Sequence, residues 1–299
     1  QQWWDWYMSL ADGPSEDDAP LIQLPQPVAH PTPNPASLSA ELSESFQLSE
    51  SQIQFFQAEG YIKLKQVLSP GAISLLRGEL VSMFENQEHQ LGKRFGSLEM
   101  MWEENQTLRE FVFSSRLAKL ATELLGVEAV RLYHDNGMSK QPGCGRTPWH
   151  YDGHHFPIAT RNVCTVWIPL QAISSDMGPL GFAKGMDVVE QCSDIPFNKF
   201  DTSYDRQVSL RLRDQNIEVE LSPFELGEIS FHHNLNFHTA GPNRTTIPRM
   251  VLATTYFEDG ARVIDEPHMV NGDWRRFMPG IEPGQVIDTP KNPVLYRRN

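Results

Sequence analysis

The sequence lacks long apolar runs, paired cysteines and an excess of basic residues. Its longest apolar stretches, such as residues 163–170, end after a few positions, whereas a membrane-spanning helix needs about 18 apolar residues or more. Its cysteines, Cys144, Cys164 and Cys192, show no CxxC spacing. We therefore expect no membrane span and no disulfide framework. A catalytic thiol is disfavoured, and the scattered cysteines fit a reducing compartment.

The formal net charge is −13, from 25 basic and 38 acidic residues. Proteins that bind nucleic acids present a basic face to the phosphates, so no nucleic-acid partner is expected. No basic segment followed by an apolar one opens the chain, which begins with Gln1, and we expect a cytoplasmic protein. The sequence leaves the oligomeric state open.

The first 47 residues differ in composition from the rest. They hold an aromatic cluster and seven prolines within 22 residues: Trp3, Trp4, Trp6 and Tyr7, then Pro14, Pro20, Pro25, Pro27, Pro31, Pro33 and Pro35. Because proline disfavours helices and central strands, we predict an extended arm over residues 1–47 and a single domain over residues 48–299. The aromatic cluster is interpreted as docking on the chain's own domain, with a partner-binding anchor as the alternative.

Helical signals open the predicted domain. Ser49 and Gln52 form a capping-box pattern, and Gly60 supplies a stop signal. Apolar residues then recur at helical spacing behind a Ser-Pro start. The predicted elements are a helix from Ser49 to Gly60, a strand over residues 61–64, a helix that starts at Ser69-Pro70, and a helix over residues 108–125.

Short strands dominate the second half of the chain. They are predicted over residues 127–133, 164–169, 217–221, 228–232 and 250–257, with turn-forming Gly, Pro, Asn and Asp between them. This pattern predicts a mainly β fold with flanking helices, in which an antiparallel sandwich or barrel lies behind an N-terminal helical layer.

One short segment combines a histidine and a carboxylate at metal-ligand spacing. It is Trp149-His150-Tyr151-Asp152, and in a strand the residues at i and i+2 point to the same face. Three histidines, His232, His233 and His238, follow near a later strand. Two histidines and one carboxylate leave positions on iron(II) open for a chelating 2-oxo acid and dioxygen.

These residues resemble the phytanoyl-CoA dioxygenase family. The stretch His238-Thr239-Ala240-Gly241-Pro242-Asn243 followed by Arg249 is similar to the family's distal-histidine motif. Residues 149–157 (WHYDGHHFP), 165–170 and 178–180 are similar to its first iron motif and the segments after that motif. The likeness covers roughly residues 48–258. It implies a double-stranded β-helix, a jelly-roll or cupin-like fold. It also implies iron(II), 2-oxoglutarate as cosubstrate, O2, and release of succinate and CO2.

The resemblance also implies roles for single residues. His150, Asp152 and His238 would bind the metal, with His238 preferred over His232 and His233 because of its distance to Arg249. Arg249 would hold the distal carboxylate of 2-oxoglutarate, since its guanidinium forms paired hydrogen bonds that a lysine does not. Asn136, Trp167, Thr165 and Lys140 would contact the cosubstrate, and Tyr151, His154 and Phe156 would border the substrate.

Two positions qualify this interpretation. Where the family often has a serine two residues after the distal histidine, this chain has Ala240, which leaves Thr239 or a water to bond the cosubstrate carboxylate. Asp152 is intact, whereas halogenases of this broader class carry a small residue there. Halogenation is therefore not expected.

Several alternatives accompany these assignments. A zinc hydrolase of the H-x-H-x-D-H kind is disfavoured because only one histidine precedes Asp152. Of His232 and His233, one should point inward and one outward, both with structural roles. Arg244 competes with Arg249 as the cosubstrate anchor, and Arg146 and Arg161 are interpreted as solvated.

The predicted function is oxidation, most simply hydroxylation, of a small organic or lipid-like metabolite. A catalytically silent β-barrel binding module is the alternative from another class, and a protein or peptide hydroxylase is the third possibility. The sequence does not identify the substrate.

Overall fold

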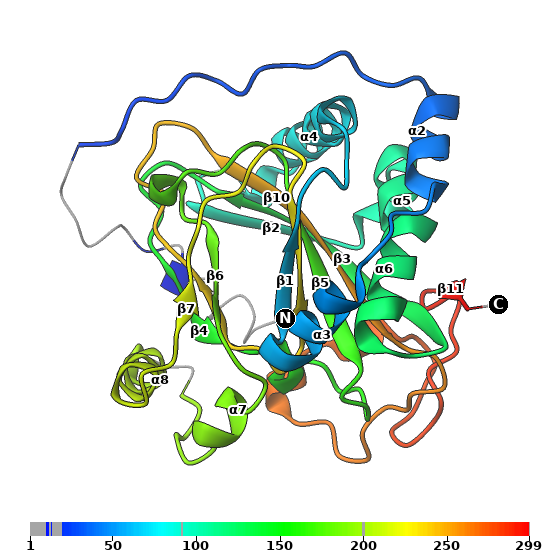
Figure 1. Cartoon of the computed structure of the whole chain (residues 1–299), viewed down its shortest axis with the longest axis vertical. Helices are drawn as coiled ribbons and strands as arrows, with labels where there is room; N and C mark the ends of the chain where they lie inside the picture. Colours follow the sequence, from blue (N-terminus) through cyan, green and yellow to red (C-terminus); the bar gives the residue numbers. More distant parts are fainter. Residues whose placement is uncertain (1–9, 12, 14–19, 91, 199–200, 299) are drawn as a thin grey trace.

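The computed structural model describes residues 10–11, 13, 20–90, 92–198 and 201–298 (Figure 1). The aromatic cluster of residues 3–7 lies outside these residues, so its predicted docking stays a prediction. Within the described part of the chain, no helix has both the length and the apolar character needed to cross a membrane.

Two antiparallel sheets form the centre of the molecule. The larger contains, in spatial order, β1 (Tyr61–Leu64), β8 (Ile229–His233), β5 (Val163–Pro169), β10 (Arg249–Glu258), β3 (Ala129–Lys140) and β11 (Val294–Arg297), and β2 (Phe95–Glu99) also pairs with β3. The smaller contains β4 (Thr147–His150), β9 (His238–Ala240), β6 (Leu180–Ala183) and β7 (Val219–Glu220). This arrangement confirms the predicted double-stranded β-helix with flanking helices.

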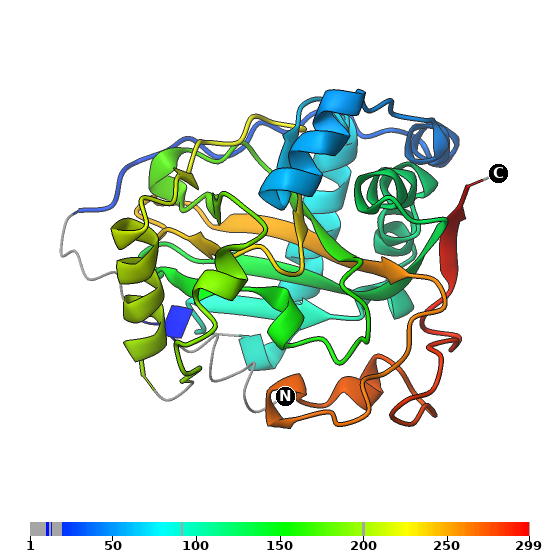
Figure 2. The same cartoon turned by 60° about the horizontal axis from the view of Figure 1, so that its bottom comes forward.

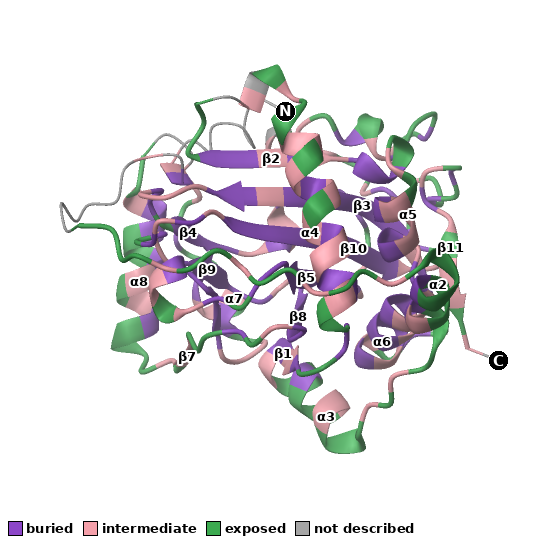
Figure 3. Ribbon diagram, turned by 90° about the horizontal axis from the view of Figure 1, so that it is seen from above, coloured by how far each residue is buried: buried purple, intermediate pink, exposed green. Residues whose placement is uncertain are grey.

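Helices cover the outer face of the larger sheet, and the strands beneath them are buried (Figures 1 and 3). The helices are α2 (Pro35–Ser43), α3 (Glu50–Glu59), α4 (Pro70–Glu85), α5 (Gln106–Val112) and α6 (Ser115–Leu125), while α7 (Val188–Gln191) and α8 (Ser203–Asp214) lie by the smaller sheet. Single 3₁₀ turns occupy Glu88–Gln90, Met101–Glu103, Asp152–His154, Ser175–Met177, Met269–Asn271 and Trp274–Arg276. The apolar stripes of α4 to α6 meet β5, β8 and β10 in one continuous core.

The local signals placed most helix ends correctly. Ser49 and Gln52 form the predicted capping box of α3, and Gly60 ends that helix in the left-handed conformation. The helix predicted over residues 108–125 is instead two helices. The chain turns at Phe113, and Ser114 caps α6 by accepting a hydrogen bond from the Leu117 N–H at 3.3 Å.

Replacing Ser114 with alanine is expected to lower the free energy of unfolding by about 1–2 kcal/mol. The buried hydroxyl caps α6 and also donates to the Leu42 carbonyl oxygen at 2.7 Å, so both bonds are lost together. Urea denaturation measures the change. Ser115→Ala is the control, and an equal loss in both variants would contradict the capping role.

The predicted extended arm is wrong for its last part, since α2 begins at Pro35. Asn34 caps this helix, and Pro35 stands in its first turn, where proline costs no hydrogen bond. The described residues directly ahead of it, 20–34, do form an extended strap. Its Ile22 pairs with Thr245, and its His30 N–H donates to the Ser74 hydroxyl at 3.0 Å.

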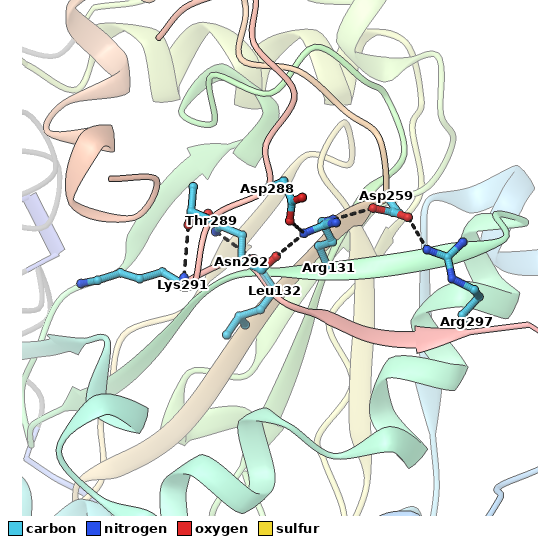
Figure 4. Close-up of polar contacts among 8 residues, drawn as sticks. All are labelled: Arg131, Leu132, Asp259, Asp288, Thr289, Lys291, Asn292 and Arg297. Atoms are coloured by element: carbon cyan, nitrogen blue, oxygen red, sulfur yellow. Dashed lines mark hydrogen bonds and ion pairs between the residues drawn. The ribbon is translucent and has the colours of Figure 1, made fainter. Parts of the chain in front are cut away.

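The chain beyond β10 passes along one end of the sheets and returns to the edge strand β11 (Figure 2). Charged groups fix this tail to β3 (Figure 4). The Arg131 guanidinium bonds Asp259 at 2.5 Å, Asp288 at 2.7 Å and the Asn292 carbonyl oxygen at 2.8 Å, and Arg297 also pairs with Asp259. The tail is therefore anchored at both of its ends.

Candidate functional site

Strand pairing brings the two histidines of the predicted triad together. His150 ends β4, His238 begins β9, and the two are register partners with ring centroids 4.0 Å apart. Asp152 does not lie in the strand as predicted. It opens the Asp152–His154 turn, which folds its carboxylate back toward both imidazoles. One side-chain donor atom from each of the three residues lies within 4.8 Å of the others.

Backbone carbonyls orient both imidazoles for metal binding. The Nδ1 of His150 lies 2.9 Å from the Pro148 carbonyl oxygen, and the Nδ1 of His238 lies 3.0 Å from that of Asn236. Each Nδ1–H therefore donates to a carbonyl, which leaves the Nε2 lone pair facing the carboxylate. Burial lowers the pKa of both rings, so they are neutral at pH 7 and free to act as ligands.

The two oxygens of Asp152 have different surroundings. Oδ1 lies 4.0 Å from His150 Nε2 and 3.7 Å from His238 Nε2, so it faces the histidine pair. Oδ2 lies 3.3 Å from His232 Nε2 and accepts a hydrogen bond from the Thr165 hydroxyl at 3.2 Å. Burial acts to raise the pKa of this carboxyl, but the surrounding histidines outweigh burial and hold it below its usual range.

His232→Phe is expected to weaken metal affinity about 10- to 100-fold, the range found when a group that orients a metal ligand is removed. Phenylalanine preserves the ring's volume but not its hydrogen bond to Asp152 Oδ2. Isothermal titration calorimetry of the metal-free protein with Co²⁺ measures the affinity. His233→Phe is the matched control, because His233 Nδ1 accepts from the Leu235 N–H instead. A similar loss in both variants would contradict this role.

Arg249 is a buried cation that lines the same cavity. Its side chain is 2% exposed, and Nη1 donates to the Gly178 carbonyl oxygen at 2.6 Å. The guanidinium carbon lies 5.3 Å from the centre of the Trp167 ring. Among the described residues no carboxylate pairs with it, and its Nε has no partner. Burial lowers its pKa to about 10, so it stays charged at pH 7.

The donor set fits the two groups that the sequence implies. Two neutral imidazoles and one carboxylate, with the remaining positions facing a cavity, match the site of non-heme iron(II) oxygenases. A buried guanidinium with an unsatisfied N–H fits a carboxylate such as the distal one of 2-oxoglutarate. The triad and Arg249 line one cavity of about 780 Å³.

The predicted cosubstrate residues divide into two groups. Asn136, Trp167 and Thr165 line the cavity, although Asn136 Oδ1 already accepts from Ser97 and Thr165 is bonded to Asp152. Lys140 is not part of the wall. Its buried Nζ donates to the carbonyl oxygens of Gly145 and Gly241 and to a threonine hydroxyl, which satisfies all three protons within the protein.

The predicted substrate residues divide in the same way. Phe156 lines the cavity together with its neighbour His155, which the sequence prediction did not include. Tyr151 and His154 lie behind that wall, where the Tyr151 hydroxyl bonds His154 Nδ1 at 3.1 Å. The turn at Asp152 causes this difference, because it reverses the chain and aims the residues after it in new directions.

The structure also locates the residues whose roles the sequence left open. Thr239 does not replace the missing serine, since its hydroxyl donates to the Thr147 carbonyl oxygen, whereas Ala240 lines the cavity. Arg146 pairs with Asp205, and Arg161 is exposed. Neither these two nor Arg244 is among the described residues of the cavity wall, whereas Arg249 is.

A double-stranded β-helix with a His-Asp-His triad at a cavity, opposite a buried arginine, defines an iron(II)- and 2-oxoglutarate-dependent dioxygenase. The sequence pattern described as phytanoyl-CoA dioxygenase (PhyH) matches residues 56–251. The chain therefore belongs to the phytanoyl-CoA dioxygenase family, and its cofactors are iron and 2-oxoglutarate.

Several known proteins are similar to this chain in sequence or in fold. A probable alpha-ketoglutarate-dependent hypophosphite dioxygenase of Stutzerimonas stutzeri is 25% identical over 216 residues, or 68% of this chain and 72% of the relative. The carbocyclase SnoK from nogalamycin biosynthesis superposes with a TM-score of 0.70 at 20% identity, over 83% of this chain and 96% of SnoK. EctD from S. alaskensis with bound Fe gives 0.59 at 16%, over 81% and 88%. The two structural likenesses show the fold.

Proposed function

We propose that this dioxygenase oxidises a small organic or lipid-like metabolite, most simply by hydroxylating a carbon atom. The observation that carries the proposal is the shared cavity, in which the triad and the buried Arg249 face the same space. A protein of similar fold supports it, since the epimerase SnoN forms a complex with Fe³⁺, alpha ketoglutarate and the organic compound nogalamycin RO.

In this proposal each residue has a defined task. His150, Asp152 and His238 hold the iron, which when bound couples the conversion of 2-oxoglutarate and O2 to succinate and CO2 with insertion of the second oxygen atom into the substrate. Arg249 binds the distal carboxylate of 2-oxoglutarate, and Trp167 packs against that guanidinium. Thr165 and His232 fix the Asp152 carboxylate so that Oδ1 remains directed at the metal.

Burial of these groups favours a small substrate over a peptide. His150, Asp152 and His238 are each at most 8% exposed, so the reacting carbon must enter the cavity to approach them. A protein hydroxylase would have to bring a peptide side chain down through the cavity to reach the triad, whose three residues are all buried.

Succinate release tests the proposal. The protein is incubated with Fe(II), 2-oxoglutarate and O2, with and without a panel of candidate metabolites, and succinate is quantified by mass spectrometry. We expect slow turnover alone, stimulation by a true substrate, and no turnover by His150→Ala. Absence of 2-oxoglutarate binding and of turnover in the unmodified protein would support the silent binding module instead, and equal turnover in the variant would contradict the role of His150.

A further inference from the structure

Four rings wall the cavity beyond the triad: Tyr133, His134, Phe156 and Phe277, here called the aromatic box. The centroids of Tyr133 and Phe156 are 4.9 Å apart, and those of His134 and Phe277 are also 4.9 Å apart. The Tyr133 and His134 rings meet edge to face at 4.9 Å. Ring faces and edges at these spacings favour contact with another ring or apolar group.

The aromatic box lies next to the place where the substrate must react. His134 on β3 is the register partner of Thr255 on β10. The Thr255 hydroxyl lies 2.9 Å from that of Thr165, which in turn donates to Asp152 Oδ2. A group seated in the box is thus held beside the carboxylate of the triad.

The imidazole of the box is uncharged. His134 is only 9% exposed, and within the described part of the chain its Nδ1 has no hydrogen-bond partner. Burial lowers the pKa of His134 to about 4, so the imidazole is neutral at pH 7. A neutral imidazole accepts or donates one hydrogen bond and offers no charge to an anion.

The charges along the rest of the wall also disfavour an anion. Apart from the triad and Arg249, the charged residues described there are Lys93, Glu99, Glu104, Asp273 and Arg276. The two basic residues are outnumbered by three acidic ones, and Arg276 already pairs with Glu99 at 3.2 Å. Lys93 lies at the exposed rim. A buried anion needs a paired cation, and the basic group described at the box, the Arg276 guanidinium 5.8 Å from the centre of the Phe277 ring, is already paired with Glu99.

We propose that the substrate of this enzyme is an uncharged ring compound carrying a hydroxyl or carbonyl group, and that small oxyanions such as hypophosphite are not its substrates. This inference rests on the proposed function and names its substrate class. The ring lies in the aromatic box, and its oxygen-bearing group bonds His134. On this inference, the likeness to a probable alpha-ketoglutarate-dependent hypophosphite dioxygenase does not extend to the substrate.

Matched probes test the proposal on protein loaded with Fe(II) and 2-oxoglutarate under argon. Calorimetry compares 2-naphthol, 2-naphthoate and hypophosphite, the first two of which share a ring system and differ in charge. We expect 2-naphthol to bind at least 10-fold more tightly than 2-naphthoate, and hypophosphite to give no binding signal. Equal or tighter binding of either anion would overturn the proposal.

Variants assign the binding to the box. Phe277→Leu keeps an apolar side chain but removes the ring, and it should weaken 2-naphthol binding about 10-fold without changing 2-oxoglutarate binding. Phe55→Ala, on the outer face of α3, should change neither. If 2-naphthol binds equally to Phe277→Leu, or fails to bind protein that binds 2-oxoglutarate, the inference fails while the proposed function stands. If the unmodified protein does not bind 2-oxoglutarate, both the inference and the proposed function are contradicted.

Discussion

Arg249→Leu is expected to raise the Kd of 2-oxoglutarate about 100-fold and to leave metal affinity unchanged. Two charge-assisted hydrogen bonds to a buried carboxylate together contribute about 3 kcal/mol, and each 1.4 kcal/mol is tenfold in affinity. Leucine removes both bonds and the charge. Calorimetry with 2-oxoglutarate on the metal-loaded protein under argon gives the Kd.

Two further variants sharpen this prediction. Arg249→Lys keeps the charge without the planar fork and should fall between the unmodified protein and the leucine variant. Arg244→Leu removes the nearest competing arginine in the sequence and should leave the Kd unchanged, because Arg244 is not part of the cavity wall. If Arg244→Leu, and not Arg249→Leu, weakens binding, the assignment of the anchor is wrong.

Asp152→Ala should weaken iron binding by about 1000-fold and reduce succinate release to background. The carboxylate is the one anionic member of the triad, and removal of one partner from a buried charge pair costs about 4 kcal/mol. Metal affinity measured with Co²⁺ and succinate release measured with Fe(II) should fall together.

Stability measurements separate ligand loss from unfolding in this variant. In the metal-free protein the lowered pKa of Asp152 means that the fold stabilises the buried carboxylate, so alanine removes this stabilisation. The metal-free variant should therefore unfold at a lower temperature than the unmodified protein but still in one cooperative transition, whereas the rise in midpoint on adding metal should disappear. A folded variant that still binds metal as tightly as the unmodified protein would contradict the ligand role.

The sequence predicted the parts of the fold that local signals control. The capping box at Ser49 and the glycine stop at Gly60 placed α3, and alternating apolar residues located most strands of the larger sheet. Strands β2, β6, β9 and β11 were missed because they are short and, unlike β1 and β8, do not alternate apolar with polar residues. The break between α5 and α6 was missed because the apolar spacing continues across Phe113.

The site shows the same division between local and long-range information. The His-x-Asp motif was visible because its residues are adjacent, although a turn and not strand alternation directs Asp152. The contact between His232 and Asp152 depends on the pairing of β8 with β5, which the sequence does not reveal. The aromatic box was invisible for the same reason, since Phe277 lies more than 100 residues after Phe156.

The anchored tail is separate in the sequence from the residues that bind iron and 2-oxoglutarate. The triad residues and Arg249 fall within residues 56–251, the stretch shared with the family, whereas Phe277, Asp259, Asp288 and Arg297 lie beyond it. Substitutions between the two anchors reshape one wall of the cavity without touching an iron ligand. Substitutions in the tail, whether they arise by evolution or by design, can therefore change which substrates fit the cavity while the residues that bind iron and 2-oxoglutarate stay the same.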